Sequence, residues 1–546
     1  MSVAPQTVRE EQLGEFAAGI HRRKYAFDRS EDWPGTARRV AENVMGAVGY
    51  APSSEVVLEV EAMIRRRKFI PGGRYLYAAG RDYHQVNNCL LLRCEDSREG
   101  WAGTFWHASM ALMTGAGIGV NYSDVRPRGS IIGRTGGFAS GPLSPMTIVN
   151  EIGRDVMQGG SRRSAIWAGL NWRHSDIFDF IRIKDWSPEL RSLKETDPTF
   201  PAPMELTNVS VALDDDFFEA YRSPQHPLHS RAHDVYWKTL KRMVKTGEPG
   251  FSIDTGVDRD ETLRNACTEV TSADDSDVCN LGSINLGRIS SKEELRYIVD
   301  LASLFLVAGT VYSDVPYKRV KRIREKNRRL GLGLMGVHEW LLQRGKSYGP
   351  DEELGEWLEV YAESTEAAAG WAYHLSLSRP VKTRAVAPNG TIGIIGETTT
   401  GVEPVFAVAY RRRYLANERW QTDYVIDPVA QRLIDQGIDP DSIEDAYSLS
   451  KDVSVRLGMQ TFLQSYVDHG ISSTINLPAP IEDPEEVHDF GNVLMGSLPH
   501  LRGVTVYPNG ARGGQPIVAV PYAEAVAAKA SVEGNEETCL GGICSI

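Results

Sequence analysis

Glycine-rich turns interrupt this chain at short intervals, and between residues 87 and 520 they separate short apolar segments from amphipathic ones. The chain has 51 glycines in 546 residues, more than the roughly 7% of an average protein. A chain that alternates short strands with helices through such turns folds as an α/β structure. Turns of this kind also suit phosphate binding, because their backbone N–H groups can face an anion.

The pattern divides the chain into three expected regions. Residues 1–84 are expected to form an N-terminal helical region, since apolar residues recur there at helical spacing, as in Val57, Val60, Met63 and Ile64. Residues 85–522 are expected to form the catalytic α/β domain. Residues 523–546 are Ala-rich and then Gly/Glu-rich without apolar periodicity, which predicts a flexible tail.

Composition restricts the partners. Hydrophobic residues make up 42% and charged residues 24% of the chain, and the net charge is -12, which argues against binding to duplex nucleic acid. No secretory signal is visible. The longest apolar run, near residues 301–312, is far shorter than the ~20 residues of a membrane helix, so no membrane association is expected. We expect a cytoplasmic protein, in which thiols stay reduced unless they are redox-active.

Cys267 lies in the sequence Asn265-Ala266-Cys267-Thr268-Glu269. In an extended segment, Asn265, Cys267 and Glu269 would project to one side. A thiol between an amide and a carboxylate suits removal of hydrogen from a carbon that bears a hydroxyl group. The carboxylate can take the hydroxyl proton and the amide can hold the developing carbonyl oxygen. Alone, the triplet also fits an ordinary strand with one buried cysteine.

The other cysteines fall into two groups. Cys279 follows a polar turn that can fold the chain back towards Cys267, and Cys89 precedes an apolar run. Spacing does not decide how they pair, because six cysteines allow many connectivities. Cys94 is expected to be inert.

Cys539 and Cys544 close the chain as a dithiol. Two cysteines are too few for a zinc site, and no metal site is predicted. On a flexible tail, such a pair can exchange electrons with a buried disulfide and then with an external reductant. The alternative is a surface pair without function.

Several motifs, taken together and in order, resemble the catalytic chain of ribonucleotide reductases. They are Asn265–Glu269, Cys279–Leu286, Arg328–Gly336, Pro388–Ile392 and Gly401–Pro404. The resemblance implies a ten-stranded α/β barrel with Cys267 on an internal finger loop. It also implies conversion of ribonucleotides, expected to be diphosphates, to 2′-deoxyribonucleotides for DNA synthesis.

The same resemblance implies roles for the site residues. Cys267 would be the thiyl radical that takes the 3′ hydrogen, with Glu269 as base and Asn265 bound to the ribose. Cys89 and Cys279 would supply two electrons and become a disulfide, which Cys539 and Cys544 would reduce again. Substrate binding is expected at Asn88, Pro388, Asn389, Gly390, Thr391 and Ile392.

The radical source is expected to be adenosylcobalamin. Reductase chains that use a separate radical subunit resemble one another in a Tyr-Tyr pair near the end of the barrel, whereas the segment Gly503–Gly514 has only Tyr507 and no such pair occurs in the chain. The glycine motif of the glycyl-radical class is absent from the tail. The sequence is therefore similar to the class II enzymes, and a class I large chain is the alternative.

Regulation and partners follow from the resemblance alone. Asp96 and Arg126 match positions that bind a deoxynucleoside triphosphate or ATP effector, and Arg162 and Arg163 lie in the loop that would couple effector to substrate. The alternative is an ordinary surface aspartate and arginines. A homodimer and a thioredoxin or glutaredoxin reductant are expected.

Two further hypotheses compete. Gly331-Leu332-Gly333-Leu334-Met335-Gly336 fits a dinucleotide-binding fingerprint, which would indicate a nicotinamide-dependent oxidoreductase. The basic, helical segment before it argues against this, because the fingerprint follows a buried strand. A nucleotide-binding scaffold without catalysis is the second hypothesis, and the complete Asn265, Cys267 and Glu269 set argues against it.

Overall fold

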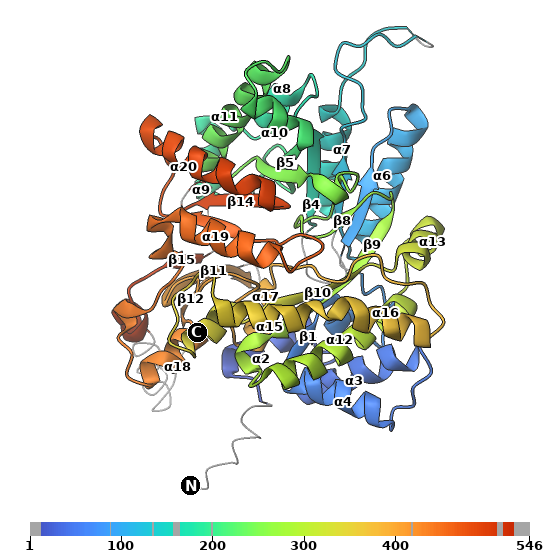
Figure 1. Ribbon diagram of the computed structural model, residues 1–546, viewed down its shortest axis with the longest axis vertical. Helices are drawn as coiled ribbons and strands as arrows, with labels where there is room; N and C mark the ends of the chain where they lie inside the picture. Colours follow the sequence, from blue (N-terminus) through green and yellow to red (C-terminus); the bar gives the residue numbers. More distant parts are fainter. Residues whose placement is uncertain are drawn as a thin grey trace, which may run out of the picture.

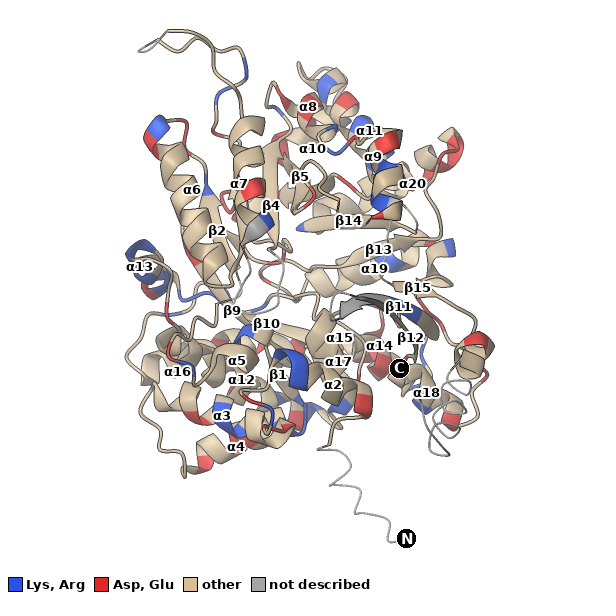
Figure 2. Ribbon diagram, turned by 180° about the vertical axis from the view of Figure 1, so that it is seen from behind, with Lys and Arg blue, Asp and Glu red and all other residues tan. Residues whose placement is uncertain are grey.

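The computed structural model describes residues 12–87, 89–133, 136–156, 164–197, 200–416, 419–509, 511 and 517–528. Helices surround a central sheet (Figure 1), and the α/β class expected from the sequence is confirmed. Figure 2 shows that charged residues are concentrated on outer helices and loops. The central strands are almost free of charge because both of their faces are covered.

The main sheet has ten strands. They are β1 (Phe69–Pro71), β2 (Cys89–Arg93), β3 (Gly117–Asn121), β4 (Ile166–Asn171), β5 (Thr207–Asp214), β6 (Gly250–Asp254), β9 (Asp277–Asn285), β10 (Leu330–Met335), β13 (Thr474–Leu477) and β14 (Gly503–Pro508). Strands β2 to β6 are parallel neighbours. Strand β9 is antiparallel to β2, and β14 is antiparallel to β6. Strand β10 continues the sheet parallel to β9, as β13 does beside β14.

Short bridges close this sheet into a barrel. Leu332 of β10 pairs with Arg384, and Val386 pairs with Ile471, both in parallel orientation. The Val386 N–H donates to the Gly470 carbonyl at 3.1 Å. Because the chain runs from Ile471 directly into β13, pairing passes from β10 to the other edge of the sheet. The expected ten-stranded barrel is confirmed.

A small hairpin forms the finger loop. Strands β7 (Leu263–Arg264) and β8 (Thr271–Ser272) pair antiparallel around residues 265–270. Barrel elements contact it from several directions: Asn121 of β3 donates to the Thr262 carbonyl at 3.0 Å, and Gly470 N donates to the Glu269 carbonyl at 2.7 Å. The loop that carries Cys267 is therefore fixed inside the barrel.

Helices cover the barrel in two groups. The first lies on the side of β2 to β6 and β14 and comprises α6 (Arg98–Met113), α7 (Leu143–Asp155), α8 (Ile177–Ile181), α9 (Pro188–Thr196), α10 (Asp215–Arg222), α11 (His229–Thr246), α19 (Val453–Gln464) and α20 (Pro484–Ser497). The second comprises α2 (Glu15–Lys24), α3 (Trp33–Gly46), α4 (Glu55–Arg65), α5 (Gly73–Ala78), α12 (Lys292–Tyr312), α13 (Lys318–Asn327), α14 (Val337–Leu342), α15 (Glu352–Ala362), α16 (Ser364–His374), α17 (Gly390–Gly396) and α18 (Pro428–Asp435). A separate sheet contains β11 (Ala409–Ala416), β12 (Arg419–Ile426) and β15 (Ile517–Ala519).

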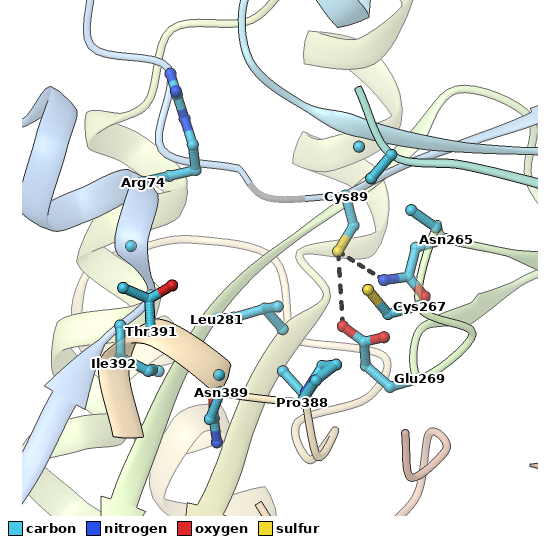
Figure 3. Close-up of a pocket in the computed structure, with 18 of the residues that line it drawn as sticks. Arg74, Cys89, Asn265, Cys267, Glu269, Leu281, Pro388, Asn389, Thr391 and Ile392 are labelled. Carbon is cyan, nitrogen blue, oxygen red and sulfur yellow. Dashed lines mark hydrogen bonds between the residues drawn. The ribbon is translucent and has the colours of Figure 1, made fainter. Parts of the chain in front are cut away.

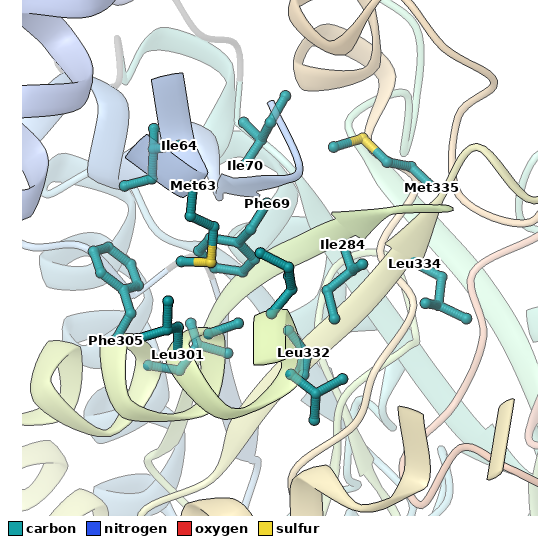
Figure 4. Close-up of a cluster of buried hydrophobic side chains, with 14 of the residues drawn as sticks. Met63, Ile64, Phe69, Ile70, Ile284, Leu301, Phe305, Leu332, Leu334 and Met335 are labelled. Carbon is teal, nitrogen blue, oxygen red and sulfur yellow. The ribbon is translucent and has the colours of Figure 1, made fainter. Parts of the chain in front are cut away.

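The N-terminal region contributes to the barrel. The apolar positions expected on a helix lie on α4 and are buried. Figure 4 shows Met63 and Ile64 of α4 beside Phe69 of β1 and Phe305 of α12. Strand β1 pairs antiparallel with β9, so residues before position 84 supply one barrel strand.

Helix α12 is longer than the apolar run seen in the sequence. It has 21 residues and is apolar enough to cross a membrane by length and composition, but 72% of its apolar window is buried inside the protein. Its buried face packs into the cluster of Figure 4. This placement is that of a core helix.

Two glycine segments lie within strands. Gly331 and Gly333 are residues of the buried strand β10, and Gly336 makes the turn into α14, so the first two glycines of the motif do not form a phosphate-binding turn. This placement argues against the nicotinamide hypothesis. Gly117 and Gly119 lie within strand β3. An ideal Cβ on Gly119 would lie 1.9 Å from the Arg264 carbonyl oxygen, so this glycine lets the finger loop approach the barrel wall.

Candidate active site

The three finger residues converge on one cavity (Figure 3). Asn265, Cys267 and Glu269 all line it. The expectation that they alternate along an extended strand is wrong, because residues 266–268 form a turn. Thr268 N donates to the Asn265 carbonyl at 3.1 Å, and Thr268 has φ +69°. Because the chain curves in this turn, the side chains of Asn265, Cys267 and Glu269 still face the same cavity.

Cys89 lies behind the finger loop. Asn265 Nδ2 lies 2.9 Å from Cys89 Sγ, and Cys89 Sγ lies 4.0 Å from Glu269 Oε1. Asn265 Oδ1 accepts a hydrogen bond from Val270 N at 2.9 Å, which fixes the direction of the amide. Cys279 is the residue opposite Cys89 in the antiparallel pair of β2 and β9. The structure thus brings both candidate reductant cysteines to the finger loop.

The environment of these two thiols is apolar. Cys89 and Cys279 belong to a buried cluster with Leu91, Leu263, Val270, Leu281, Ala385 and Ala387. Burial raises the pKa of both thiols well above the ordinary value, and the negative charge of Glu269 raises each further. Both cysteines are therefore neutral S–H groups at neutral pH. Cys267 differs from them in being only partly buried.

The cavity has a volume of about 390 Å³. Residues 387–392 form one wall, where Asn389 begins α17 with φ +57°. Asn389 Nδ2 donates to Ser283 Oγ at 2.9 Å and to the Leu334 carbonyl at 3.2 Å. The Asn389 side chain thus anchors the loop, and Gly390 begins a helical turn whose first N–H groups have no intrahelical acceptor.

Sequence reasoning missed the wall contributed by the N-terminal region. Lys24, Tyr25, Arg74 and Tyr77 also line the cavity. They lie in the region that was expected to be separate from the catalytic domain, and no motif marked them. Only the packing of α2 and α5 against the barrel reveals them.

A buried ion-pair network supports the base of the finger loop. Arg329 Nε contacts Asp277 Oδ2 of β9 at 2.7 Å, and Arg329 Nη2 contacts Glu261 Oε1 at 2.9 Å. Glu261 also accepts from Thr271 Oγ1 at 2.5 Å and pairs with Lys382 at 2.6 Å. The network ties the finger loop to the strand that carries Cys279. Sequence reasoning placed Arg329 in a family motif but gave it no role.

Comparison with known proteins assigns the fold. Residues 87–230, 227–377 and 379–497 match the model of the ribonucleotide reductase barrel domain. The chain belongs to the ribonucleotide reductase family.

Relatives of this reductase include the vitamin B12-dependent ribonucleoside-diphosphate reductase of Mycobacterium tuberculosis (strain CDC 1551 / Oshkosh), 27% identical over 88% of this chain and 74% of the relative. A protein of the same name from Thermoplasma acidophilum is 26% identical over 82% and 64%. A putative adenosylcobalamin-dependent ribonucleoside-triphosphate reductase of Mycobacterium phage D29 is 27% identical over 83% and 75%.

Among solved structures, the reductase resembles the Actinobacillus ureae class Id ribonucleotide reductase alpha subunit. The TM-score is 0.70 at 18% identity, over 91% of this chain and 97% of the other. At this identity the likeness concerns the fold.

Two of the residues expected to bind an effector, Asp96 and Arg126, lie together in the reductase. Arg126 Nε contacts Asp96 Oδ2 at 2.7 Å. Asp96 follows the carboxyl end of β2, and Arg126 follows the carboxyl end of the parallel strand β3. Cys89 is the first residue of β2, at its opposite end. From the rise of an extended chain, this pair lies about 20 Å from Cys89.

Several expected residues cannot be placed. Asn88, Arg162, Arg163, Cys539 and Cys544 lie outside the described residues. Cys94 is buried in the core beneath α6 and α7, and burial raises its pKa to about 12. Its position gives it no access to the cavity chemistry.

Proposed function

We propose that this chain reduces ribonucleoside diphosphates to 2′-deoxyribonucleoside diphosphates through a thiyl radical on Cys267. The observation that carries the proposal is the arrangement of three cysteines. Cys267 and Cys89 both line the cavity, Cys279 lies opposite Cys89 in the strand pair of β2 and β9, and Cys89 and Cys279 are neutral thiols. One thiol is thus placed to take a hydrogen atom and two are placed to supply electrons.

The residues divide the reaction between them. The Cys267 thiyl radical takes the 3′ hydrogen atom, and Glu269 accepts the 3′ hydroxyl proton. Asn265 donates a hydrogen bond to the oxygen at that carbon. The 2′ hydroxyl leaves as water, the Cys89 and Cys279 thiols supply two electrons and two hydrogens, and a Cys89–Cys279 disulfide forms. Cys267 then returns the hydrogen atom to C3′, and Glu269 returns the proton to the 3′ oxygen.

Adenosylcobalamin is the proposed radical source. Two relatives are named as vitamin B12-dependent and one as adenosylcobalamin-dependent. The sequence contains no Tyr-Tyr pair for a relay from a radical subunit. When bound, this cofactor would supply the radical. The chain's own contribution is Cys267, whose partial exposure at the cavity fits a radical source that approaches from the cavity side.

The remaining partners are proposals of the same kind. Cys539 and Cys544 would reduce the Cys89–Cys279 disulfide and pass the oxidation to a thioredoxin or glutaredoxin in the cytoplasm. Asp96 and Arg126, with Arg162 and Arg163, would bind a deoxynucleoside triphosphate or ATP. A homodimer is supported by exposed apolar side chains on α6 and α7, namely Trp106, Met113 and Ile148.

The test is anaerobic reduction of CDP and CTP by the purified protein with dithiothreitol and an effector, with and without adenosylcobalamin. We expect dCDP only when the cofactor is present, and no product from Cys267→Ala. Reduction of CTP alone would change the substrate to a triphosphate. Activity that needs a separate radical subunit would make the chain a class I large subunit.

A further inference from the structure

His469 belongs to none of the motifs seen in the sequence, yet it contacts the finger loop directly. It is fully buried, and its Nδ1 accepts a hydrogen bond from Thr271 N at 3.2 Å. Thr271 begins β8, two residues after Glu269. We propose that His469 is a positioning residue that uses this bond to keep Glu269, the proposed base, in its catalytic position. This role rests on the proposed function and adds a residue to its machinery.

Two consecutive residues, His469 and Gly470, bond the segment that carries Glu269. Gly470 N donates to the Glu269 carbonyl at 2.7 Å, and an ideal Cβ on Gly470 would lie 3.2 Å from that carbonyl oxygen. A parallel strand pair would continue with a bond from Thr271 N to the Gly470 carbonyl. The Gly470 carbonyl instead accepts from Val386 N at 3.1 Å. The His469 side chain therefore supplies the acceptor that Thr271 N needs.

This bond requires a neutral imidazole, because only an unprotonated Nδ1 can accept. The backbone N–H of Thr271 is the donor, since Thr271 Oγ1 donates to Glu261 Oε2 at 2.5 Å. His469 Nε2 has no hydrogen-bond partner among the residues that the structure describes. Burial lowers the pKa of His469 well below its usual value, and nearby cations lower it further. These cations are Arg329, Lys382, Arg264 and Arg384.

The backbone around His469 is itself anchored to the barrel. His469 N donates to the Arg384 carbonyl at 3.0 Å, and Gln464 Nε2 of α19 donates to the His469 carbonyl at 2.9 Å. The Asp468 carboxylate accepts from Thr383 N at 3.0 Å and from Arg384 N at 2.8 Å. The acceptor at Nδ1 therefore has a fixed position relative to the barrel wall.

Glu269 takes its position from these two bonds to its backbone segment. Its carboxylate faces the cavity, where Oε1 lies 4.0 Å from Cys89 Sγ (Figure 3). A base has to lie within hydrogen-bond reach of the proton that it takes, and a displacement of about 1 Å can cost on the order of 100-fold in rate. His469 is not among the described residues that line the cavity. Its effect on the reaction therefore passes through Glu269.

The test compares three substitutions of His469 with one control. His469→Leu removes the acceptor. His469→Asn keeps an acceptor near the place of Nδ1, whereas His469→Gln moves the acceptor one bond farther from the backbone. The matched control is His338→Leu. His338 is also fully buried and its Nδ1 accepts from Val405 N at 3.0 Å, but it is not among the described residues that line the cavity.

Two measurements are made on the full-length protein. Hydrogen exchange at the Thr271 amide is followed by mass spectrometry without cobalamin. CDP reduction with adenosylcobalamin gives kcat and KM for each variant, and for His469→Leu also in a Glu269→Gln background. Urea unfolding gives the stability of each variant.

In His469→Leu, the Thr271 amide should exchange about 10-fold faster or more, because its acceptor is lost. The value of kcat should fall about 10- to 100-fold while KM stays within about two-fold of wild type. His469→Asn should recover most of both losses, and His469→Gln should not. His338→Leu should lower the urea midpoint by a similar amount but keep the wild-type kcat and the wild-type exchange at Thr271.

The Glu269→Gln background separates positioning of the base from a general effect on the fold. There, His469→Leu should lower kcat by at most about two-fold, because residues that act through one another are not additive. Equal losses of kcat with Glu269 and with Gln at position 269 would overturn the proposal. Wild-type exchange at Thr271 in His469→Leu would also overturn it.

If His469→Leu does not fold, the contrast between His469→Asn and His469→Gln decides. Equal kcat in these two variants would overturn the proposal, and a higher kcat in His469→Asn would support it. If the wild type reduces no nucleotide, the proposed function itself fails. Exchange at Thr271 then still decides whether His469 holds the finger loop.

Discussion

Cys89 of β2 lies directly opposite Cys279 of β9 in an antiparallel register. Opposed residues in such a pair have Cα atoms about 4.5 to 5.5 Å apart, which lies within the range of disulfides. The two thiols can therefore join without movement of the barrel strands. Cys89 and Cys279 are not joined by a disulfide in the structure.

We expect a single turnover to link Cys89 to Cys279. In a Cys539→Ser, Cys544→Ser background that cannot reduce the pair again, CDP turnover without dithiothreitol should yield one Cys89–Cys279 peptide by mass spectrometry. The same background with Cys267→Ala should yield none. A disulfide that contains Cys94, or wild-type turnover by Cys279→Ser, would contradict this assignment.

Replacing the carboxylate of the finger loop should slow the chemical step. Glu269→Gln should lower kcat about 100- to 10,000-fold with little change in KM, because it removes the proposed base but keeps the shape of the side chain. The Gln variant should also lower the pKa of Cys89, since the charge of Glu269 contributes to its elevation. The alkylation rate of Cys89 against pH measures this shift, and an unchanged kcat would exclude Glu269 as the base.

A methyl group on Gly119 should displace the finger loop. Its Cβ would lie 1.9 Å from the Arg264 carbonyl oxygen and 2.8 Å from the carbonyl carbon, so backbone has to move. Gly119→Ala should therefore lower kcat about 100-fold, the cost of misplacing Cys267 by about 1 Å. Gly458→Ala on α19 is the control, because nothing lies within 4 Å of its Cβ position. Full activity in Gly119→Ala would mean that the loop tolerates the shift.

The ion-pair network should dominate local stability. Arg329→Met leaves the buried Asp277 and the partly buried Glu261 without this partner, and it should lower the free energy of unfolding by about 3 to 5 kcal/mol. Arg329→Lys should recover part of this loss. The control is Arg296→Met, which breaks an exposed pair with Glu363 and should cost at most about 1 kcal/mol. Urea unfolding monitored by circular dichroism measures each value, and similar losses in the two Met variants would contradict the prediction.

Acid should destabilise the fold partly through His338. Burial and the nearby Arg456 lower the pKa of His338 from 6.5 to about 3. The unfolded chain therefore takes up this proton first as the pH falls below 6.5, and the stabilisation present above that pH is lost. The free energy of unfolding should fall by about 2 kcal/mol between pH 7 and pH 5 from this group.

The variant for comparison is His338→Gln. In the wild type, Val405 N donates a hydrogen bond to His338 Nδ1 at 3.0 Å, and the side-chain oxygen of glutamine can accept the same bond. Between pH 7 and pH 5, the free energy of unfolding of this variant should fall by about 2 kcal/mol less than that of the wild type. His374→Gln, at an exposed position, should keep the wild-type fall. Equal falls in all three proteins would exclude His338 as a cause of acid sensitivity.

The chemistry of the site could be predicted because its main residues are close together in the sequence and their side-chain types indicate the reaction. Asn265, Cys267 and Glu269 occur within five residues, so any compact local conformation keeps them together. Their actual conformation could not be predicted. The turn at Thr268 depends on Gly470 bonding the Glu269 carbonyl and on Gly119 leaving room for Arg264, and these partners are distant in sequence.

The sequence by itself determined the α/β class, the buried α4 positions and the set of reactive residues, because periodicity and local composition encode them. Only the tertiary structure decided the pairing of Cys89 with Cys279, the support of the finger loop by Arg329, and the presence of Lys24 in the cavity wall. Each of these depends on strand pairing or packing between segments that lie far apart in the sequence. A local sequence pattern does not indicate which distant strand or helix end will pack beside it.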